Sequence, residues 1–267
     1  MPLTFATWNI NSVRLRLPMV LEFLQQYQPD VLALQEIKCT NDQFPAAAFA
    51  EAGYPYQAVH GQKGYHGVAT ISRLPLSESH SRGFCDIPDS RHVAATLDFG
   101  RGPLTVHNFY IPAGGDEPDP EINPKFRHKL DFLAELQVWF DTPVFDSSQL
   151  IAGDFNIAPH ENDVWSHKQL LKVVSHTPIE TEFLNALLAR RQWVDLVRKH
   201  IPDSEKLYSW WSYRAKDWDA ADKGRRLDHI WSTPDIAAHS AGAEILRPAR
   251  GWSEKPSDHV PVLTRFN

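Results

Sequence analysis

Residues 149–156 have the sequence Gln-Leu-Ile-Ala-Gly-Asp-Phe-Asn, a short apolar run that ends at a carboxylate and an amide. The run from Gln149 to Ala152 predicts a buried strand, and Asp154 and Asn156 follow it at once. A lone Asp or Asn after a strand is most often a turn former or a cap. This stretch becomes informative because the same arrangement recurs along the chain.

Polar side chains end the other predicted strands in the same way. Because the ends of neighbouring strands converge in space, we expect these groups to line one cleft. Taken singly, each group has a structural explanation, such as an ion pair of Asp228 with Arg225 or Arg226. The groups are Asn9 and Asn11 after residues 3–8, Gln35 and Glu36 after 31–34, Tyr110 at the end of 104–110, Asp228 in 227–231, and Ser257-Asp258-His259 before 260–266.

Three helices are predicted between these strands. Thr177-Pro178-Ile179-Glu180 fits a capping box and opens a helix that runs to about residue 190. The other two are marked by apolar residues at helical spacing, namely Leu17, Val20, Leu21 and Leu24 in the first and Phe126, Leu130, Leu133 and Phe140 in the second.

Strand patterns in two groups, with few helices between them, suggest stacked sheets covered by helices. Further strand patterns lie at residues 66–72 and 92–99. The Pro-rich residues 112–124 form one long irregular segment, for which a functional surface loop is the better interpretation than a domain boundary. We therefore expect a single catalytic domain over residues 1–267.

Composition limits the class of protein. The 267 residues are 42% hydrophobic and 22% charged, which is ordinary for a globular chain. Two cysteines suit a reducing compartment. The chain shows no signal peptide and no apolar run near the ~18 residues that span a membrane, so we expect a soluble, cytoplasmic protein without a membrane partner. A net charge of −6 argues against an indiscriminate nucleic-acid binder, although a bound cation would offset several carboxylates.

The residue types in the expected cleft suit hydrolysis of a phosphodiester. An anionic phosphate repels hydroxide, so a hard cation held by carboxylate and amide oxygens helps to neutralise the charge. A base must take a proton from water, and the departing alkoxide must be stabilised. Glu, Asp, Asn, His and Tyr supply these parts.

Eight segments together resemble the exonuclease III and abasic-endonuclease family of the endonuclease/exonuclease/phosphatase superfamily. They follow the family's order and span nearly the whole chain. The resemblance implies a four-layer α/β/β/α sandwich of the α+β class, with two packed, mainly antiparallel sheets and helices outside. The segments are Trp8-Asn9-Ile10-Asn11, Leu34-Gln35-Glu36-Ile37-Lys38, Gly64-Tyr65-His66-Gly67-Val68, Asn108-Phe109-Tyr110-Ile111-Pro112, Gly153-Asp154-Phe155-Asn156, Tyr208-Ser209-Trp210-Trp211-Ser212-Tyr213-Arg214, Arg226-Leu227-Asp228 and Ser257-Asp258-His259.

The resemblance also implies an activity and site residues. It implies a Mg²⁺-dependent DNA-repair phosphodiesterase, with Mn²⁺ as a substitute, that acts on double-stranded DNA at abasic sites and 3′ ends and has possible 3′-phosphatase activity. We expect a monomer with one principal metal site. The implied catalytic residues are Tyr110, Asp154, Asn156, Asp228 and His259. The implied metal environment is Asn9, Glu36, Asp154, Asn156, Asp258 and His259, with Asn11 and Lys38 adjacent.

DNA contacts and a substrate pocket follow from the same resemblance. Trp210 and Leu227 are expected to wall a pocket for a flipped-out, base-less sugar. Three residues depart from the family pattern: Arg225 replaces a bulky apolar pocket residue, Ala113 a polar amide, and His229 an aromatic or aliphatic residue. The expected DNA-binding set is Tyr65, Arg91, Trp210, Arg214, Arg225, Arg226 and Leu227.

Two other functions are weighed against this one. The first is a phosphatase that acts on a small phosphoester, for which the segment from Tyr208 to Arg214 gives no support. The second is a non-catalytic, nucleic-acid-binding regulator of the same fold, against which the retention of Glu36, Asp154 and His259 argues. Mg²⁺-dependent nicking of abasic DNA separates the three.

Overall fold

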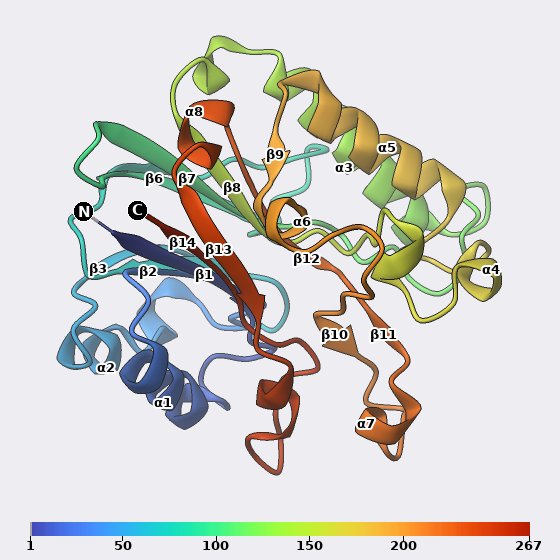
Figure 1. Ribbon diagram of the computed structural model, residues 1–267, viewed down its shortest axis with the longest axis horizontal. Helices are drawn as coiled ribbons and strands as arrows, with labels where there is room; N and C mark the ends of the chain where they lie inside the picture. The colour runs from blue at the N-terminus through green and yellow to red at the C-terminus, as the bar shows by residue number, and fades with distance from the viewer. Residues whose placement is uncertain (1) are drawn as a thin grey trace.

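Two mixed sheets of six strands each pack face to face in the computed structural model, which describes residues 2–267 (Figure 1). Sheet A contains, in spatial order, β13 (Ser240–Ile245), β14 (Val262–Phe266), β1 (Leu3–Asn9), β2 (Val31–Gln35), β4 (Val68–Ser72) and β3 (Tyr56–His60). Sheet B contains β5 (Ser77–His80), β6 (His92–Asp98), β7 (Pro103–Tyr110), β8 (Gln149–Asp154), β12 (Asp228–Ser232) and β9 (Val194–Asp195).

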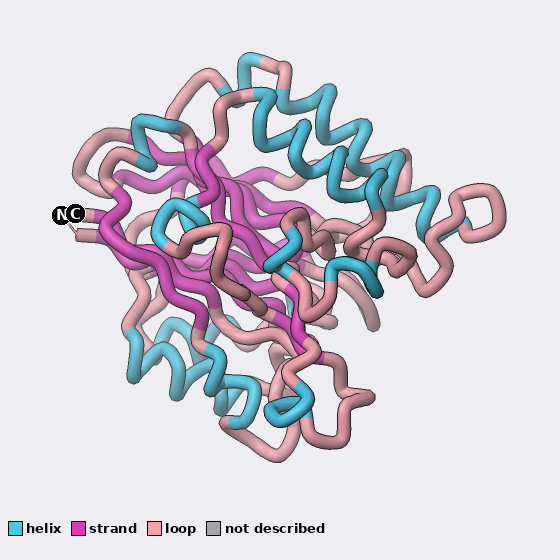
Figure 2. The backbone as a smooth tube through the Cα atoms, turned by 45° about the vertical axis from the view of Figure 1, so that its right-hand side comes forward, coloured by secondary structure: helices cyan, strands magenta, loops and turns pink. Residues whose placement is uncertain are grey.

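Helices cover the outer faces of both sheets. Helices α1 (Leu17–Tyr27) and α2 (Ala46–Glu51) lie outside sheet A, and α3 (Pro124–Phe140) and α5 (Pro178–Arg190) lie outside sheet B (Figures 1 and 2). The predicted four-layer α/β/β/α sandwich is therefore confirmed. Shorter elements complete the chain: α4 (His167–Leu170), α6 (Leu196–His200), α7 (Trp218–Ala221), α8 (Pro234–Ala237), and the strand pair β10 (Trp210–Trp211) and β11 (Gly224–Arg225).

The apolar core forms three layers that hold the sandwich together. Phe5 and Ile230 are buried between the two sheets, Phe23 lies between sheet A and α1, and Phe132 lies between sheet B and α3. Full burial of one such side chain stabilises the fold by roughly 1.5–3 kcal/mol. The sheets are thus fixed against each other from inside and outside.

Local sequence sets the ends of the predicted helices. Thr177 and Glu180 form the expected capping box at the start of α5. Helix α1 carries a proline in its first turn, where no donor is lost, and ends at Gln28 in the left-handed conformation. All three predicted helices are confirmed, with bounds set by these signals.

Each sheet contains one parallel strand pair, joined by a helix. β1 and β2 are connected through α1, and β7 and β8 through α3. Parallel strands end at the same edge of a sheet, so Asn9 pairs with Gln35 and Tyr110 with Asp154. The antiparallel strand β12 then places Asp228 opposite Asp154. Strand pairing therefore gathers polar residues from distant parts of the chain at one end of the sandwich.

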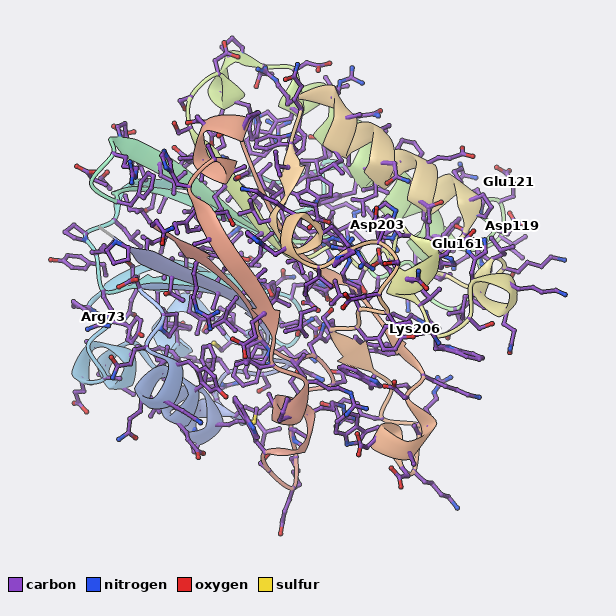
Figure 3. All side chains as sticks on the ribbon, viewed as in Figure 1. Arg73, Asp119, Glu121, Glu161, Asp203 and Lys206 are labelled. Carbon is purple, nitrogen blue, oxygen red and sulfur yellow. The ribbon has the colours of Figure 1, made fainter. Side chains whose placement is uncertain are left out.

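The irregular segment predicted for residues 112–124 is confirmed for residues 111–123, which contain no helix or strand. The loop's acidic residues Asp119 and Glu121 lie at the outer edge of the molecule (Figure 3). Among residues 2–267, no helix has the length and apolar character needed to cross a membrane.

Gly153 is the position in β8 where a side chain is least tolerated. Its φ is +139°, and a Cβ atom there would lie 1.9 Å from the backbone oxygen of Phe109 on β7. The close approach lets β8 end beside β7 with Asp154 facing the site. Glycine is needed here for both its conformation and its lack of volume.

Gly153→Ala should therefore lower the free energy of unfolding, by about 2 kcal/mol or more, because overpacking and backbone strain add together. Urea denaturation followed by circular dichroism would measure the change. Gly242→Ala in β13 is the matched control, since a Cβ there meets nothing within 4 Å. Equal stability of the two variants would contradict the claim that this contact constrains β8.

Candidate active site

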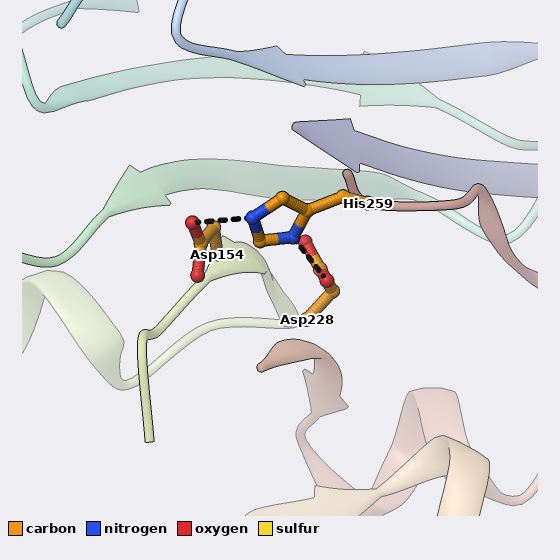
Figure 4. Close-up of side chains that lie close together, drawn as sticks. All are labelled: Asp154, Asp228 and His259. Atoms are coloured by element: carbon orange, nitrogen blue, oxygen red, sulfur yellow. Dashed lines mark hydrogen bonds and ion pairs between the residues drawn. The ribbon is translucent and has the colours of Figure 1, made fainter. Parts of the chain in front are cut away.

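A buried histidine between two carboxylates forms the centre of the site (Figure 4). The Nδ1 atom of His259 lies 2.8 Å from Oδ2 of Asp228, and its Nε2 atom lies 3.6 Å from Oδ2 of Asp154. At most 5% of any of these three side chains is exposed. Asp228 thus orients the ring and leaves Nε2 facing Asp154.

Ser209 fixes the carboxylate of Asp228. Its hydroxyl donates to Oδ2 of Asp228 at 2.6 Å and accepts from the backbone N–H groups of Leu227 and Asp228. Ser209 lies in the segment from Tyr208 to Arg214, but no role was predicted for it. Its position before Trp210 in the sequence does not predict the contact with Asp228, because only the fold brings these two residues together.

Glu36 lies across the site from His259, at the end of β2. Its carboxylate accepts from the Nδ2 group of Asn9 at 2.9 Å and from the Tyr110 hydroxyl at 3.0 Å, and Lys38 lies 2.8 Å from Oε2. Asn9 also donates to Oδ2 of Asp154 at 2.8 Å. One asparagine therefore connects the two carboxylates.

The carboxylate of Asp258 lies on the same cavity and connects Asn11 to Trp210. It accepts from the Nδ2 group of Asn11 at 3.1 Å and from the indole N–H of Trp210 at 2.9 Å. Lys38 in turn donates to Oδ1 of Asn11 at 2.6 Å. Asn11 and Lys38 therefore contact the carboxylates of Asp258 and Glu36, and their place beside a metal stays a prediction.

Asn156 follows Asp154 in a tight turn with positive φ, +54°. Its backbone N–H donates to Oδ1 of Asp154 at 2.9 Å, and its side chain donates to Oδ2 of Asp154 at 3.2 Å and to the carbonyl of Ile111 at 2.9 Å. Asparagine tolerates this backbone conformation better than most residues. The turn holds both polar side chains toward the same cavity.

The charges in the site act on one another because the groups are buried. Burial raises the pKa of Asp154; His259 opposes this rise and Asp228 adds to it. Burial alone would lower the pKa of His259, but Asp228 and Asp154 outweigh it and raise the pKa above its ordinary value. The imidazole is thus held as a cation between two carboxylates.

Glu36 and Tyr110 differ in the charge that they carry. Burial alone would raise the pKa of Glu36, but Lys38 and the hydrogen bond from Asn9 lower it below its ordinary value. Burial raises the pKa of Tyr110, and Glu36 adds to the rise. Glu36 is therefore an anion and Tyr110 a neutral hydrogen-bond donor.

The donor set fits a hard divalent cation. Ligand atoms of Asp154, Asp228 and His259 lie within 4.8 Å of one another, and Oδ1 of Asp228 is buried without a hydrogen-bond partner. Glu36 and Asp258 add two further carboxylates on the same cavity. Oxygen-rich sites of this kind suit Mg²⁺ or Mn²⁺ better than soft metals.

These groups open onto a cavity of about 540 Å³. The cavity wall also contains the indoles of Trp165 and Trp210, each with a cation over its ring. The Arg225 guanidinium carbon lies 5.2 Å from the Trp210 ring centroid, and the Lys223 Nζ atom lies 4.6 Å from that of Trp165. The lining includes Glu36, Tyr110, Ala113, Asp154, Asn156, Trp165, Trp210, Arg214, Lys223, Arg225, Leu227, Asp258 and His259.

The predicted DNA-contacting residues lie in three kinds of place. Trp210, Leu227, Arg225 and Arg214 line the cavity, whereas Tyr65 is 73% exposed outside it. Arg91 is 6% exposed, and its guanidinium carbon lies 5.0 Å from the Tyr110 ring centroid. Direct DNA contact by Arg91 and Tyr65 stays a prediction.

The expectation that Arg226 contacts DNA is wrong, and so is its alternative pairing with Asp228. Arg226 is fully buried and forms ion pairs with Asp163 at 2.9 Å and Asp195 at 2.6 Å. Arg226 and Leu227 lie in the connection between β11 and β12. Leu227 faces the cavity, whereas Arg226 is held in the interior by its two aspartates.

The three departures from the family pattern have different surroundings. Arg225 donates from one terminal nitrogen to the carbonyl of Val174 at 2.9 Å and to the hydroxyl of Ser175 at 2.7 Å. Ala113 lines the cavity without offering a polar side chain. His229 is buried under sheet B and contacts the carbonyl of Ile157 at 2.8 Å. Arg225 and Ala113 therefore bear on the substrate, and His229 does not.

The two sheets bring carboxylates, an imidazole and amides together at one polar cavity. This fold and this set of side chains are typical of the class of metal-dependent phosphodiester hydrolases. The family model described as "Endonuclease/Exonuclease/phosphatase family" matches residues 6–259. The chain belongs to this family and, within it, to the exonuclease III and AP endonuclease group.

Three relatives support this placement. An exodeoxyribonuclease III of Haemophilus influenzae is 33% identical, with 98% of this chain and 99% of the relative covered. The 3′ phosphatase NExo of Neisseria, solved with a product DNA hairpin, has a TM-score of 0.90 and 32% identity over 99% of each chain. An AP endonuclease of Archaeoglobus fulgidus gives the same TM-score, identity and coverage.

The predicted family, fold and enzyme class are thus confirmed: the chain is a DNA-repair nuclease of the exonuclease and AP endonuclease type. The structure brings the predicted catalytic and metal residues together around one cavity. Their individual roles, and the choice of metal, remain proposals.

Replacing Arg226 should affect stability and not DNA binding. Arg226→Met leaves Asp163 and Asp195 buried without their shared partner, which should lower the free energy of unfolding by about 3–5 kcal/mol. Urea denaturation gives this value, and the salt dependence of DNA affinity tests the second claim. Arg214→Met, at an exposed cavity residue, is the matched control and should show the opposite pattern. A reduced salt slope in folded Arg226→Met would restore the original expectation.

Proposed function

We propose that this chain is a Mg²⁺-dependent enzyme that hydrolyses the DNA backbone 5′ to abasic sites and degrades duplex DNA from 3′ ends. The observation that carries the proposal is the buried Asp228–His259–Asp154 arrangement facing Glu36 across one cavity. It supplies a base, an anion-binding cation and metal ligands around the space for a single phosphate. Trp210 and Leu227 give the cavity apolar surface that suits a sugar without a base.

The residues around the cavity have different roles in hydrolysis of the phosphodiester. Asp154 orients the attacking water and takes its proton, and Asn156 holds that water or the phosphate. His259, oriented by Asp228, contacts the scissile phosphate. Tyr110 donates from its neutral hydroxyl to the phosphate or to the departing 3′-oxygen. A positioned base of this kind contributes about 10²–10⁴-fold to a rate.

Glu36 would be the main ligand of the metal ion, with Asp258 and Asn9 beside it. Asp154 and Asn156 would complete its environment beside Glu36. The expected place of His259 among the metal ligands does not fit, because an imidazole held as a cation has no lone pair for a metal. Bound Mg²⁺ would supply positive charge that polarises the phosphate and stabilises the leaving oxygen. Lys38 and Asn11, which contact Glu36 and Asp258, would hold these ligands in place. Mn²⁺ should substitute, since it takes the same oxygen ligands.

The cavity and the relatives together support DNA as the substrate. Double-stranded DNA with abasic sites or 3′ ends is the proposed substrate, in accord with the AP endonuclease and 3′ phosphatase relatives named above. Removal of a 3′-phosphate is a further activity of the same site. We propose that the enzyme works as a cytoplasmic monomer.

Incubation with plasmid DNA that carries abasic sites, with and without EDTA, tests the function. Nicking that needs Mg²⁺ and is lost with EDTA is the expected result. Binding without nicking would support the regulatory alternative. Hydrolysis of a small phosphoester alone would support the phosphatase alternative.

Asp154→Asn and His259→Asn should each lower kcat by at least about 10²-fold while the fold is retained, because both groups act on one phosphate. Single-turnover nicking and circular dichroism measure the two quantities. Asp98→Asn and His80→Asn, exposed on sheet B, are matched controls. Rates like those of the original chain for both site variants would remove these residues from the mechanism.

Arg225→Leu should raise the preference for abasic DNA over undamaged 3′ ends. Loss of the cation over Trp210 leaves a more apolar pocket, and a contact of ~1 kcal/mol corresponds to roughly a fivefold change in the ratio of kcat/KM values. Lys223→Met is the control, because it removes a charge from the same cavity and leaves Arg225 in place. An unchanged ratio in Arg225→Leu would show that Arg225 does not shape the pocket.

A further inference from the structure

Lys129 is a buried cation that the reaction outlined above does not use. It lies on the inner face of α3 and is fully buried, 0% exposed. Its Nζ atom donates to the backbone carbonyl of Asn156 at 2.8 Å and to that of Ala113 at 3.4 Å, and it forms an ion pair with Glu180 of α5. Burying an ammonium group is costly unless its hydrogen bonds are satisfied. All its partners lie next to the active site.

The bond to Asn156 falls on the backbone unit that shapes the catalytic turn. Asn156 has φ +54°, a conformation that most residues with a side chain adopt only under constraint. Its N–H and its side chain both contact Asp154. Lys129 holds the carbonyl of the same residue from the helix side. The turn is therefore fixed from two directions, with Asp154 in front and Lys129 behind.

Glu180 extends this contact to the opposite wall of the cavity. Its carboxylate accepts from the backbone N–H of Ser175 at 2.9 Å and from the N–H and hydroxyl of Thr177 at 3.1 and 2.7 Å. Ser175 in turn accepts from Arg225, which lies over Trp210. The Lys129–Glu180 pair thus joins the catalytic turn to the segment that carries the substrate pocket.

We propose that Lys129 is a positioning residue for the nuclease reaction: with Glu180 it sets the distance between the Asp154–Asn156 turn and the pocket wall. This inference rests on the proposed function. A buried ion pair adds little net stability compared with a well-packed apolar pair, so stability alone does not account for its place. Misplacing a catalytic group by about 1 Å costs up to ~10²-fold in rate.

The test compares three variants on abasic duplex DNA under single-turnover and steady-state conditions. Lys129→Met should lower kcat by about 10- to 100-fold and leave KM within about twofold, because the turn acts mainly in the transition state. Glu180→Gln keeps the ammonium on Asn156 but removes the charge that joins Lys129 to residues 175–177, so its kcat should fall by less than that of Lys129→Met, by about 3- to 10-fold. Leu133→Ala, one turn along α3 and fully buried in the core, is the control for loosened helix packing and should retain kcat.

The double variant Lys129→Met/Glu180→Gln keeps the test decisive if Lys129→Met folds poorly. It removes the uncompensated carboxylate, so its urea midpoint should recover toward that of Glu180→Gln while kcat stays low. Recovery of kcat together with stability would overturn the inference, as would a rate for Lys129→Met equal to that of the original chain. If the original chain itself does not nick abasic DNA, the proposed function fails, and that result is distinct from either of these.

Discussion

The site depends on one buried imidazole placed between two carboxylates. Asp228 holds Nδ1 of His259 at 2.8 Å, and Asp154 lies 3.6 Å from Nε2. Because these side chains are buried, their charges interact more strongly than they would at the surface. The arrangement therefore favours the charged form of the imidazole. It also orients the carboxylate of Asp154 toward Nε2 of His259. Asn9 connects this centre to Glu36, which lines the same cavity.

Backbone geometry makes that arrangement possible. Each sheet contributes one pair of parallel strands connected by a helix, and both pairs end at the same side of the sandwich. A strand end can present a side chain without belonging to a mobile loop, so the site rests on rigid elements. Gly153 permits the closest approach of two such strands. Catalytic groups from both sheets meet because the sheets pack face to face.

The cavity combines surfaces of opposite character. It is lined both by carboxylates that suit a metal and by the indoles of Trp165 and Trp210, each with a cation over its ring. DNA requires both kinds of surface, since phosphates need charge and exposed sugars or bases need apolar partners. Arg225 makes the pocket more polar than the family pattern predicts.

Local sequence patterns predict eight of the twelve strands in the two sheets, the three main helices and the polar residues that end the strands, since periodicity and capping are local properties. Strands β3, β5, β9 and β13 were not predicted. These local patterns do not show which side of a helix or strand faces the interior of the protein. Leu130 was expected on the inner face of α3, but it is half-buried, while Lys129 is fully buried there. Arg226 was likewise expected at the DNA and lies in the interior. Only the tertiary structure decided these cases, because a buried charge is stable only where distant partners meet it, and their positions depend on the packing of the whole chain.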